Sequence, residues 1–293
     1  MIKKGSKVAI VCCSNGQSLN YKKKLEKLQE VLIQLGLEPV WSDYIYAVDE
    51  VFSGTATERA DALMNFYKDE SVKVIFDISG GDIANEILPY LDFNIIAQSE
   101  KKFWGYSDLT TILNAIYTKT EKHGVLYQIR NLIYDNAKYQ IQQFREMIVE
   151  DEISERDFGK SVLFLFDYEF VQKKQMRGIV VGGNIRCLLK LAGTPYFPNM
   201  AGKILLLEAY GGEEPQMVTY LNQLKQMGIF EQVAGILLGT FTKMEQGDTN
   251  GTTMVDLVKR YAGAEIPIAV TRDIGHGTDS KAIVIGQEIC LDN

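Results

Sequence analysis

A serine stands where a short apolar strand passes directly into a helix. Residues 103–110 read FWGYSDLT, with Ser107 at the corner. A serine on such a strand-to-helix turn presents its hydroxyl as a nucleophile, and the helix N-terminus offers backbone N–H groups to a developing oxyanion. A serine in front of a helix is also an ordinary N-cap. The segment therefore supports two interpretations, a catalytic nucleophile and a helix cap.

A serine nucleophile usually needs a histidine as its base, and the chain contains two histidines. His123 ends a charged run, residues 119–123, which is typical of the solvated C-terminus of a helix. His276 follows the predicted strand 266–270 and has a glycine on each side. Flanking glycines let backbone and substrate approach closely, and loops at the C-terminal ends of strands build the sites of open α/β sheets. His276 is therefore the predicted base.

Glu208 ends a continuous apolar strand, residues 203–208. A carboxylate at that position is costly to bury without a partner. In a catalytic triad such a carboxylate accepts the N–H of the base, fixes its tautomer and stabilises the imidazolium. The same residue could also emerge into solvent at the end of the strand. Both interpretations stay open at this point.

A pair of glycines, Gly80 and Gly81, follows the predicted strand 71–78. The pair could serve a tight turn, or it could form a nest of N–H groups that faces the site. Right-handed crossovers place successive parallel strands side by side, so this pair and Ser107 are predicted to lie at adjacent strand ends. The backbone N–H groups of Gly81 and Asp108 would then form an oxyanion hole.

The composition indicates a globular protein with a small substrate. Of 293 residues, 46% are hydrophobic and 24% are charged, and no apolar run approaches the roughly 18 residues of a membrane helix. The net charge of -7, without a stripe of Lys and Arg, argues against nucleic-acid binding. The apolar run 8–13 is shorter than a secretory core and is expected to be the first strand. A cytoplasmic protein with no membrane partner is predicted.

The four cysteines, Cys12, Cys13, Cys187 and Cys290, match neither a disulfide framework nor the spacing of metal ligands. They are predicted to be reduced core thiols, which makes a cysteine hydrolase the weaker hypothesis. The first turn lacks the spacing of a dinucleotide loop, and phosphate-loop and zinc-helix motifs are absent from the sequence. No cofactor and no metal are predicted.

Alternating strands and helices predict an α/β protein with a parallel sheet in its first half. A polar helix at 137–147 and the acidic run 150–157 mark a boundary between two domains, 1–150 and 161–293, with a cleft between them. Gly286 and Gln287 fit a hairpin turn between two closing strands. The predicted elements are strands 7–13, 38–41, 71–78, 203–208, 233–239, 266–270, 282–285 and 288–291, and helices 21–35, 56–67, 85–88, 215–227 and 254–261.

Several of these motifs, in this order, resemble the serine peptidases that include the LD-carboxypeptidases of murein recycling and the microcin C immunity proteins. The matching segments are SGGD, NEILPYLD, GYSDLT, GGN, GT, KILLLE and GH, at residues 79–82, 85–92, 105–110, 182–184, 193–194, 203–208 and 275–276. The segment LPYLD favours the microcin-immunity branch. Two departures from the family bear on substrate preference. Many relatives have Arg or Ile where this chain has Ser79, and Gly-Pro where its strand after His123 continues through residues 127–130.

The resemblance implies a Ser-Glu-His triad at Ser107, Glu208 and His276, the same residues that strand-end reasoning selects. It implies a Rossmann-like N-terminal domain, a smaller C-terminal α/β domain, an active site at their interface, and a homodimer without metal. The positions of Gly80 and Asn184 would contact the substrate.

The predicted activity is amide hydrolysis through an acyl-enzyme. A murein tetrapeptide and a peptidyl or aminoacyl nucleotide compete as the substrate. A catalytically silent binding or sensing protein on the same fold is the alternative.

Overall fold

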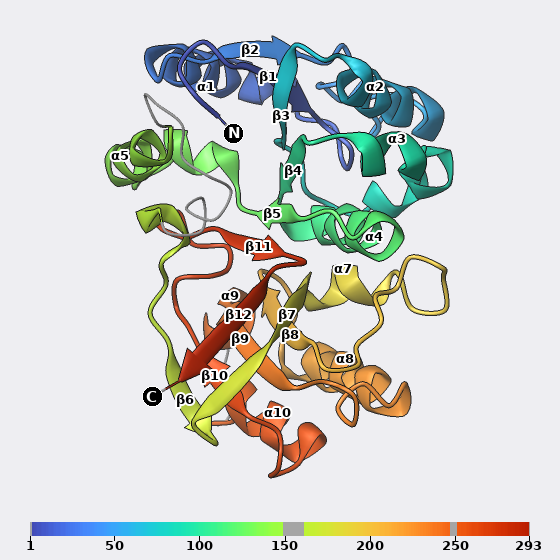
Figure 1. Ribbon diagram of the computed structural model, residues 1–293, viewed down its shortest axis with the longest axis vertical. Coiled ribbons are helices and arrows are strands. Elements are labelled where there is room, and N and C mark those ends of the chain that lie inside the picture. The colour runs from blue at the N-terminus through green and yellow to red at the C-terminus, as the bar shows by residue number, and fades with distance from the viewer. Residues whose placement is uncertain (1, 149–160, 247–250, 293) are drawn as a thin grey trace.

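The computed structural model describes residues 2–148, 161–246 and 251–292. Their strands form two sheets, and helices flank each of them. In Figure 1 the first sheet lies in the upper part of the molecule and the second sheet in the lower part. The predicted α/β class is confirmed, with a Rossmann-like N-terminal sheet and a second α/β unit. The predicted boundary at residues 150–161 falls on a stretch that lies almost entirely outside the described residues, so the division into 1–150 and 161–293 stays a prediction.

The first sheet has the strand order β11-β5-β4-β3-β1-β2. β1 to β5 run parallel, and β11 pairs with β5 in the antiparallel direction. In this order the chain moves from β1 to one side for β2 and to the other side for β3. The strands are β1 (Lys7–Val11), β2 (Glu38–Trp41), β3 (Val72–Asp77), β4 (Lys102–Gly105), β5 (Gly124–Leu126) and β11 (Ile283–Ile285).

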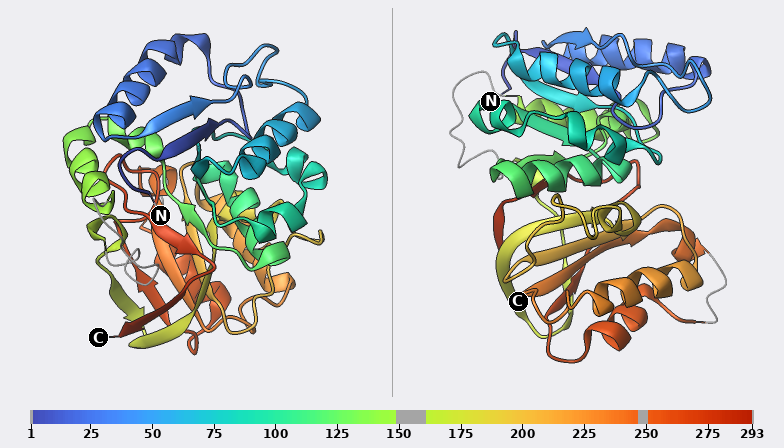
Figure 2. Two further views of the ribbon diagram at one scale, coloured as in Figure 1. Left: turned by 45° about the horizontal axis from the view of Figure 1, so that its top comes forward. Right: turned by 90° about the vertical axis from the view of Figure 1, so that its right-hand side faces the viewer.

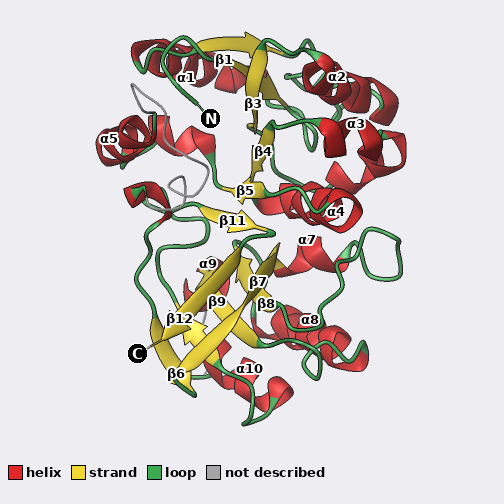
Figure 3. Cartoon of the chain, viewed as in Figure 1, coloured by secondary structure: helices red, strands yellow, loops and turns green. Residues whose placement is uncertain are grey.

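Helices cover both faces of this sheet, so its central strands are apolar on both sides (Figure 3). Val8 and Ile10 of β1 pack with α1 and α5 on one face, whereas Ala9 and Val11 pack with α2, α3 and α4 on the other. Thr55 starts α2 with a capping box to Glu58. The helices are α1 (Lys22–Gln34), α2 (Ala56–Lys68), α3 (Phe93–Gln98), α4 (Thr110–Thr120) and α5 (Ala137–Met147).

The second sheet has the order β12-β7-β8-β9-β10-β6, with four parallel central strands and an antiparallel strand at each edge. Helices α7, α8 and α10 cover one of its faces. Its strands are β6 (Glu169–Gln172), β7 (Gln175–Asn184), β8 (Ile204–Ala209), β9 (Gly235–Phe241), β10 (Ile268–Val270) and β12 (Glu288–Asp292), and its helices are α7 (Ile185–Leu189), α8 (Glu214–Gln226), α9 (Thr242–Gln246) and α10 (Met254–Ala262).

One hydrophobic core is continuous between the two halves. Ile112 and Ile116 of α4 belong to the same buried cluster as Val180 of β7, Leu206 of β8 and Leu237 of β9. The uncovered face of the second sheet therefore packs toward α4, as the side view shows (Figure 2, right). Burying apolar surface between the halves stabilises their mutual placement, and with it any site that takes residues from both.

The closing hairpin predicted at Gly286 and Gln287 is wrong. β11 pairs with β5 of the first sheet, and β12 pairs with β7 of the second. The turn bonds to β7 instead, since Gly286 N–H donates to Val180 O and Val180 N–H donates to Gln287 O. Ile283, Val284 and Ile285 are all buried in the first sheet, which is what fixes this crossing. The chain thus returns to its first half before it ends.

The strand predicted to continue through residues 127–130 is also shorter than expected. β5 ends at Leu126, and residues Ile129–Ile133 form a 3-10 helix. Tyr127 N–H still donates to Gly105 O, after which the chain leaves the sheet. Arg130 is therefore carried on a turn of helix rather than on a strand.

None of the helices in the described ranges combines the length and the apolar character that crossing a bilayer requires.

Candidate active site

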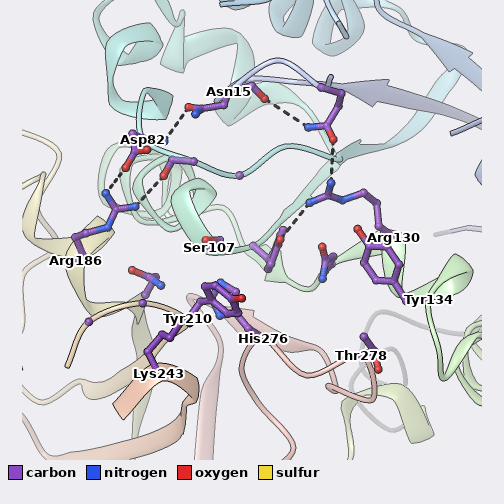
Figure 4. A pocket seen from close by; sticks show the side chains of 18 of the residues that line it. Asn15, Asp82, Ser107, Arg130, Tyr134, Arg186, Tyr210, Lys243, His276 and Thr278 are labelled. Carbon is purple, nitrogen blue, oxygen red and sulfur yellow. Dashed lines mark hydrogen bonds and ion pairs between the residues drawn. The ribbon is translucent and has the colours of Figure 1, made fainter. Parts of the chain in front are cut away.

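A cleft of about 1140 Å³ opens at the end of the first sheet and takes residues from both halves of the chain (Figure 4). In open α/β sheets, ligand sites form outside the carboxyl ends of the strands where the strand order reverses, here between β1 and β3. The loops after β1 and β3 contribute Asn15, Gly80 and Gly81 to the lining, and Ser107 follows β4. The prediction that Gly80–Gly81 and Ser107 lie at adjacent strand ends is confirmed, because β3 and β4 pair directly.

Ser107 occupies a left-handed backbone conformation with φ of 54°. It begins the short 3-10 helix that leads into α4, and Tyr106 rather than Ser107 is the residue in front of that helix. Left-handed backbone is unfavourable for any residue except glycine, Asn and Asp. This strain lifts the serine out of the strand direction and into the cleft, as in a nucleophile elbow.

Replacing Ser107 by glycine is expected to release this strain. Left-handed backbone costs a side-chain-bearing residue about 1 kcal/mol, so Ser107→Gly should unfold with a free energy about 0.5–1.5 kcal/mol higher than Ser107→Ala. Both variants lack the hydroxyl, so the difference between their free energies of unfolding reports the cost of the left-handed backbone conformation. Urea denaturation of the two variants measures it. An alanine variant at least as stable as the glycine variant would show that the turn is unstrained.

Glu208 and His276 form a hydrogen-bonded pair, with 2.6 Å between His276 Nδ1 and Glu208 Oε2. Along β8, Ile204 and Leu206 face the core shared by the two halves, and the two-residue period of a strand directs Glu208 to the same side. The pairing of β8 with β9 is irregular between Leu207 and Ala209, so Glu208 lies at a bulge. Bulges redirect side chains beside active sites. Glu208 is 2% exposed, which excludes the interpretation that it emerges into solvent.

Two aromatic rings and one glycine hold His276 in place. Its imidazole lies 5.2 Å from the ring of Tyr106 and 5.5 Å from the ring of Tyr210, centre to centre. Gly275 has φ of 149°, and a Cβ there would stand 2.0 Å from Thr240 Oγ1, so this position needs glycine. His276 lines the same cleft as Ser107. Its Nε2 is buried and has no hydrogen-bond partner among the described residues.

The loop after β3 is fixed from both sides. Asp82 N–H donates to Asn15 Oδ1 over 2.9 Å, and Arg186 Nη2 donates to Gly81 O over 2.8 Å. Gly81 has φ of 125°, and a Cβ there would collide with the Asn15 amide at 2.2 Å. Gly80 lies beside the serine, because a Cβ on it would be 3.8 Å from Ser107 Cβ. The loop is thus rigid and close to the serine hydroxyl.

The side chain of Asp108 has a structural task. It is fully buried, accepts from Ser14 Oγ over 2.6 Å and from Ala84 N–H over 2.9 Å, and forms an ion pair with Lys190 of the second half. Its backbone N–H is in the first turn of a helix, where amides have no intrahelical acceptor. Asp108 is therefore immobile beside Ser107, with its amide available.

Asn184 lines the cleft and also caps α7. Its side-chain oxygen accepts from Cys187 N–H over 3.3 Å, and its own N–H donates to Thr110 Oγ1 over 3.0 Å. In the register of the parallel pair β7 and β8, Asn184 stands opposite Glu208. Asn184 and Glu208 therefore lie side by side on β7 and β8 of the second sheet. The predicted site residues of the first half, Gly80, Gly81 and Ser107, lie in the segments that follow β3 and β4.

The remaining sequence candidates lie elsewhere. His123 is exposed beyond the end of α4. Burial raises the pKa of the Cys12 thiol to about 12 and raises that of Cys13 as well, so neither is a ready nucleophile. Cys187 is buried too, but Cys290 is exposed at an edge strand, so its assignment to the core was wrong. Within the described ranges, no group of three or more His, Cys, Asp or Glu side chains is arranged to hold a metal.

Sequence reasoning missed Arg186, Tyr210 and Lys243 as cleft residues, whereas residues 127–130, which include Arg130, were expected near the cleft. Tyr210 was inconspicuous because it follows β8 without a motif of its own, and only the fold brings its ring to 5.5 Å from the imidazole of His276. The signal available for Arg186 was its place two residues after the GGN motif, residues 182–184. Spacing alone could not show that it crosses the cleft to Asp82.

A serine on a strained strand-to-helix turn and a Glu-His pair facing the same cleft define an α/β serine hydrolase. Family models agree. The LD-carboxypeptidase N-terminal domain matches residues 8–128 and the LD-carboxypeptidase C-terminal domain matches residues 177–291. The chain therefore belongs to the LD-carboxypeptidase family of serine peptidases.

Both branches of the resemblance are represented among similar proteins. The probable murein peptide carboxypeptidase of Bacillus subtilis is 28% identical over 92% of this chain and 84% of its own length. The microcin C7 self-immunity protein MccF, solved in complex with glutamyl sulfamoyl guanosine, superposes with a TM-score of 0.87 at 20% identity, over 99% of this chain and 94% of that one. The muramoyltetrapeptide carboxypeptidase of Oxalobacter formigenes gives 0.81 at 23% identity, over 98% and 95%.

Proposed function

We propose that Ser107, His276 and Glu208 are the catalytic triad of this serine peptidase. The observation that carries the proposal is the 2.6 Å hydrogen bond from His276 Nδ1 to the buried Glu208, in a cleft that also holds a serine at positive φ. An imidazole held at Nδ1 directs its other nitrogen outward as a base. The unpartnered Nε2 of His276 supports this role, because it has capacity for a proton from Ser107 Oγ.

The reaction follows from these roles. Ser107 Oγ attacks the amide carbonyl while its proton passes to His276 Nε2. The backbone N–H groups of Gly81 and Asp108 stabilise the oxyanion of the tetrahedral intermediate. When the intermediate collapses, the C–N bond breaks and Nε2 returns the proton to the leaving nitrogen. Water then hydrolyses the acyl-enzyme by the same route, with His276 again as base and Glu208 stabilising the imidazolium.

Two substrates fit this chemistry, and similar proteins represent each. One is the terminal D-amino acid amide of a murein tetrapeptide, and the other is an aminoacyl or peptidyl nucleotide of the kind bound by MccF. Gly80 and Asn184 would contact the substrate, since both line the cleft that holds Ser107 and His276. Tyr210, beside the imidazole of His276, and Tyr220 both line the cleft and offer stacking surface.

The test is product release by the purified protein. It is incubated separately with murein tetrapeptide and with glutamyl sulfamoyl guanosine, and free D-alanine and free glutamate are quantified. Release from either substrate, abolished in Ser107→Ala, supports the proposal and assigns the substrate. No release from either, with no covalent adduct of a fluorophosphonate on Ser107, would favour a silent binding protein on the same fold.

The predicted homodimer and the predicted cytoplasmic location remain part of this proposal. They derive from the family resemblance and from the composition of the chain, whereas the contacts described above all lie within one protomer.

A further inference from the structure

Arg130 is a buried guanidinium on the wall of the cleft. It stands in the 3-10 helix that follows β5, is 9% exposed, and lines the cleft together with Ser107 and His276. Its Nη1 donates to Gln17 Oε1 over 2.9 Å, and its Nη2 donates to the hydroxyl of Tyr106 over 3.1 Å (Figure 4). Both acceptors are neutral groups. They orient the guanidinium without compensating its charge.

No carboxylate within residues 2–148, 161–246 and 251–292 forms an ion pair with Arg130. Two other cations near this site, Arg186 and Lys190, differ in that respect, because they are paired with Asp82 and Asp108. The Nε of Arg130 is buried and has no partner among the described residues. Burial lowers the pKa of the guanidinium while the phenols of Tyr106 and Tyr134 raise it, and the net direction is upward, so the group stays charged.

A buried charge without a counter-ion is unfavourable unless something compensates it. Arg130 has five N–H donors, and two of them are used by described residues. The planar fork of a guanidinium matches a carboxylate or a phosphate with two parallel hydrogen bonds. A bound anion would therefore satisfy both the missing charge and the free donors.

The position of Arg130 tells which part of a substrate carries that anion. The ring of Tyr106 packs against the imidazole of His276 at 5.2 Å, and the hydroxyl of the same tyrosine contacts Arg130. The side chain of Tyr106 therefore connects His276 at its ring with Arg130 at its hydroxyl. The oxyanion loop with Gly81 and Arg186 lies on the opposite side of Ser107 (Figure 4). The group that departs must lie over His276, because it takes its proton there.

We propose that Arg130 binds an anionic group of the leaving part of the substrate. The inference rests on the proposed function, because it defines the leaving side by the roles of Ser107 and His276. In a terminal amino acid the carboxylate is two bonds beyond the scissile nitrogen, which places the anion on the leaving side of the cleft, where Arg130 lies. In an aminoacyl nucleotide the phosphate-type linkage would occupy the same place. Both sources share one chemistry, an anion close to the scissile nitrogen on the leaving side.

Binding to a variant without the nucleophile tests the inference separately from turnover. In a Ser107→Ala background, calorimetry compares murein tetrapeptide with the same peptide ending in a carboxamide. We expect the acid to bind about 10- to 100-fold more tightly than the amide, the range of one charge-assisted contact. Adding Arg130→Met should reduce this ratio to about one, and Arg130→Lys should leave an intermediate ratio because it keeps the charge without the fork.

Arg260→Met is the matched control, because Arg260 is exposed in the last turn of α10 and does not line the cleft. Thermal unfolding of each variant tests whether the fold is intact. If Arg130→Met does not fold, the comparison of acid and amide binding in Arg130→Lys decides the case. Glutamyl sulfamoyl guanosine forms the second arm. Suppose that Arg130→Met loses the binding of this nucleoside analogue, while the protein with Arg130 binds the peptide acid and the peptide amide equally. That result assigns the anion to the nucleotide linkage.

Equal binding of acid and amide together with unchanged binding of the nucleoside analogue would overturn the inference, as would a failure of all three ligands to bind Ser107→Ala. These outcomes differ from a failure of the proposed function. If the triad is wrong, the wild-type protein releases no product and Ser107 takes no fluorophosphonate, whatever Arg130 binds.

Discussion

Replacing Ser107 with alanine should lower kcat/KM by about 10⁴- to 10⁶-fold, the range seen when a serine nucleophile is removed from a triad. The hydroxyl is the attacking group in the proposed mechanism, so no neighbouring side chain can take its place. Its loss should leave the fold intact, because Ser107 Oγ makes no hydrogen bond to the described residues. The measurement is the rate of product release from whichever substrate the wild-type protein cleaves.

Ser99→Ala provides a serine-to-alanine control outside the cleft, and it should retain wild-type activity. Mass spectrometry after treatment with a fluorophosphonate adds a readout that needs no substrate. The wild-type protein and Ser99→Ala should gain one adduct, on Ser107, and Ser107→Ala should gain none. Residual activity within tenfold of the wild type in Ser107→Ala would remove this residue from the mechanism.

Replacing Glu208 with glutamine should lower kcat by about 10³- to 10⁴-fold while KM changes little. Glutamine keeps the shape of the side chain, but it cannot stabilise an imidazolium, and its amide can donate to Nδ1 and so favour the wrong tautomer of His276. The 2.6 Å contact and the burial of both side chains make the effect large, because water cannot replace the carboxylate there. Steady-state kinetics separate kcat from KM.

A double variant distinguishes a catalytic unit from two independent residues. If Glu208 acts through His276 on Ser107, Ser107→Ala combined with Glu208→Gln should be no slower than Ser107→Ala alone. Glu231→Gln, an exposed glutamate in a turn outside the cleft, should behave as the wild type. Losses that multiply in the double variant would place Glu208 outside the triad.

Local patterns in the sequence selected the residues of the proposed triad because strand ends carry distinctive signals. A carboxylate at the end of the run KILLLE, a histidine between two glycines and a serine before a helix each stand out against apolar neighbours. The structure places Ser107 and His276 on one cleft with Gly81 and Asn184, and it places Glu208 within hydrogen-bond distance of His276. The parallel order of β3 and β4 could also be predicted, since consecutive βα units of this kind usually pair.

Long-range pairing was beyond such patterns. Residues 283–285 have the composition of any buried strand, and nothing in them distinguishes β12 from β5 as a partner. A hairpin across Gly286 satisfied every local rule, yet Ile283 and Ile285 are buried in the core around α4. Tertiary packing therefore overrode the local preference for a hairpin.

The conformation of Ser107 and the environment of Arg130 illustrate the same limit at the site. Backbone strain at Ser107 exists because β4 and α4 are both anchored in the core, so the residue between them absorbs the change in direction. The uncompensated charge of Arg130 depends on which acids fold away from it, and that is a property of the whole arrangement.

By itself, the sequence determined the α/β class and most elements of the two sheets, and it selected the serine, glutamate and histidine that we propose as the triad, because strand and helix periods and strand-end residues are local properties of the chain. Only the tertiary structure decided that β11 returns to the first sheet, that a bulge directs Glu208 toward His276, and that Arg130 faces the cleft without an acid partner among the described residues. These features depend on burial and charge balance between segments that lie far apart in the sequence, such as β5 and β11, which no local pattern encodes.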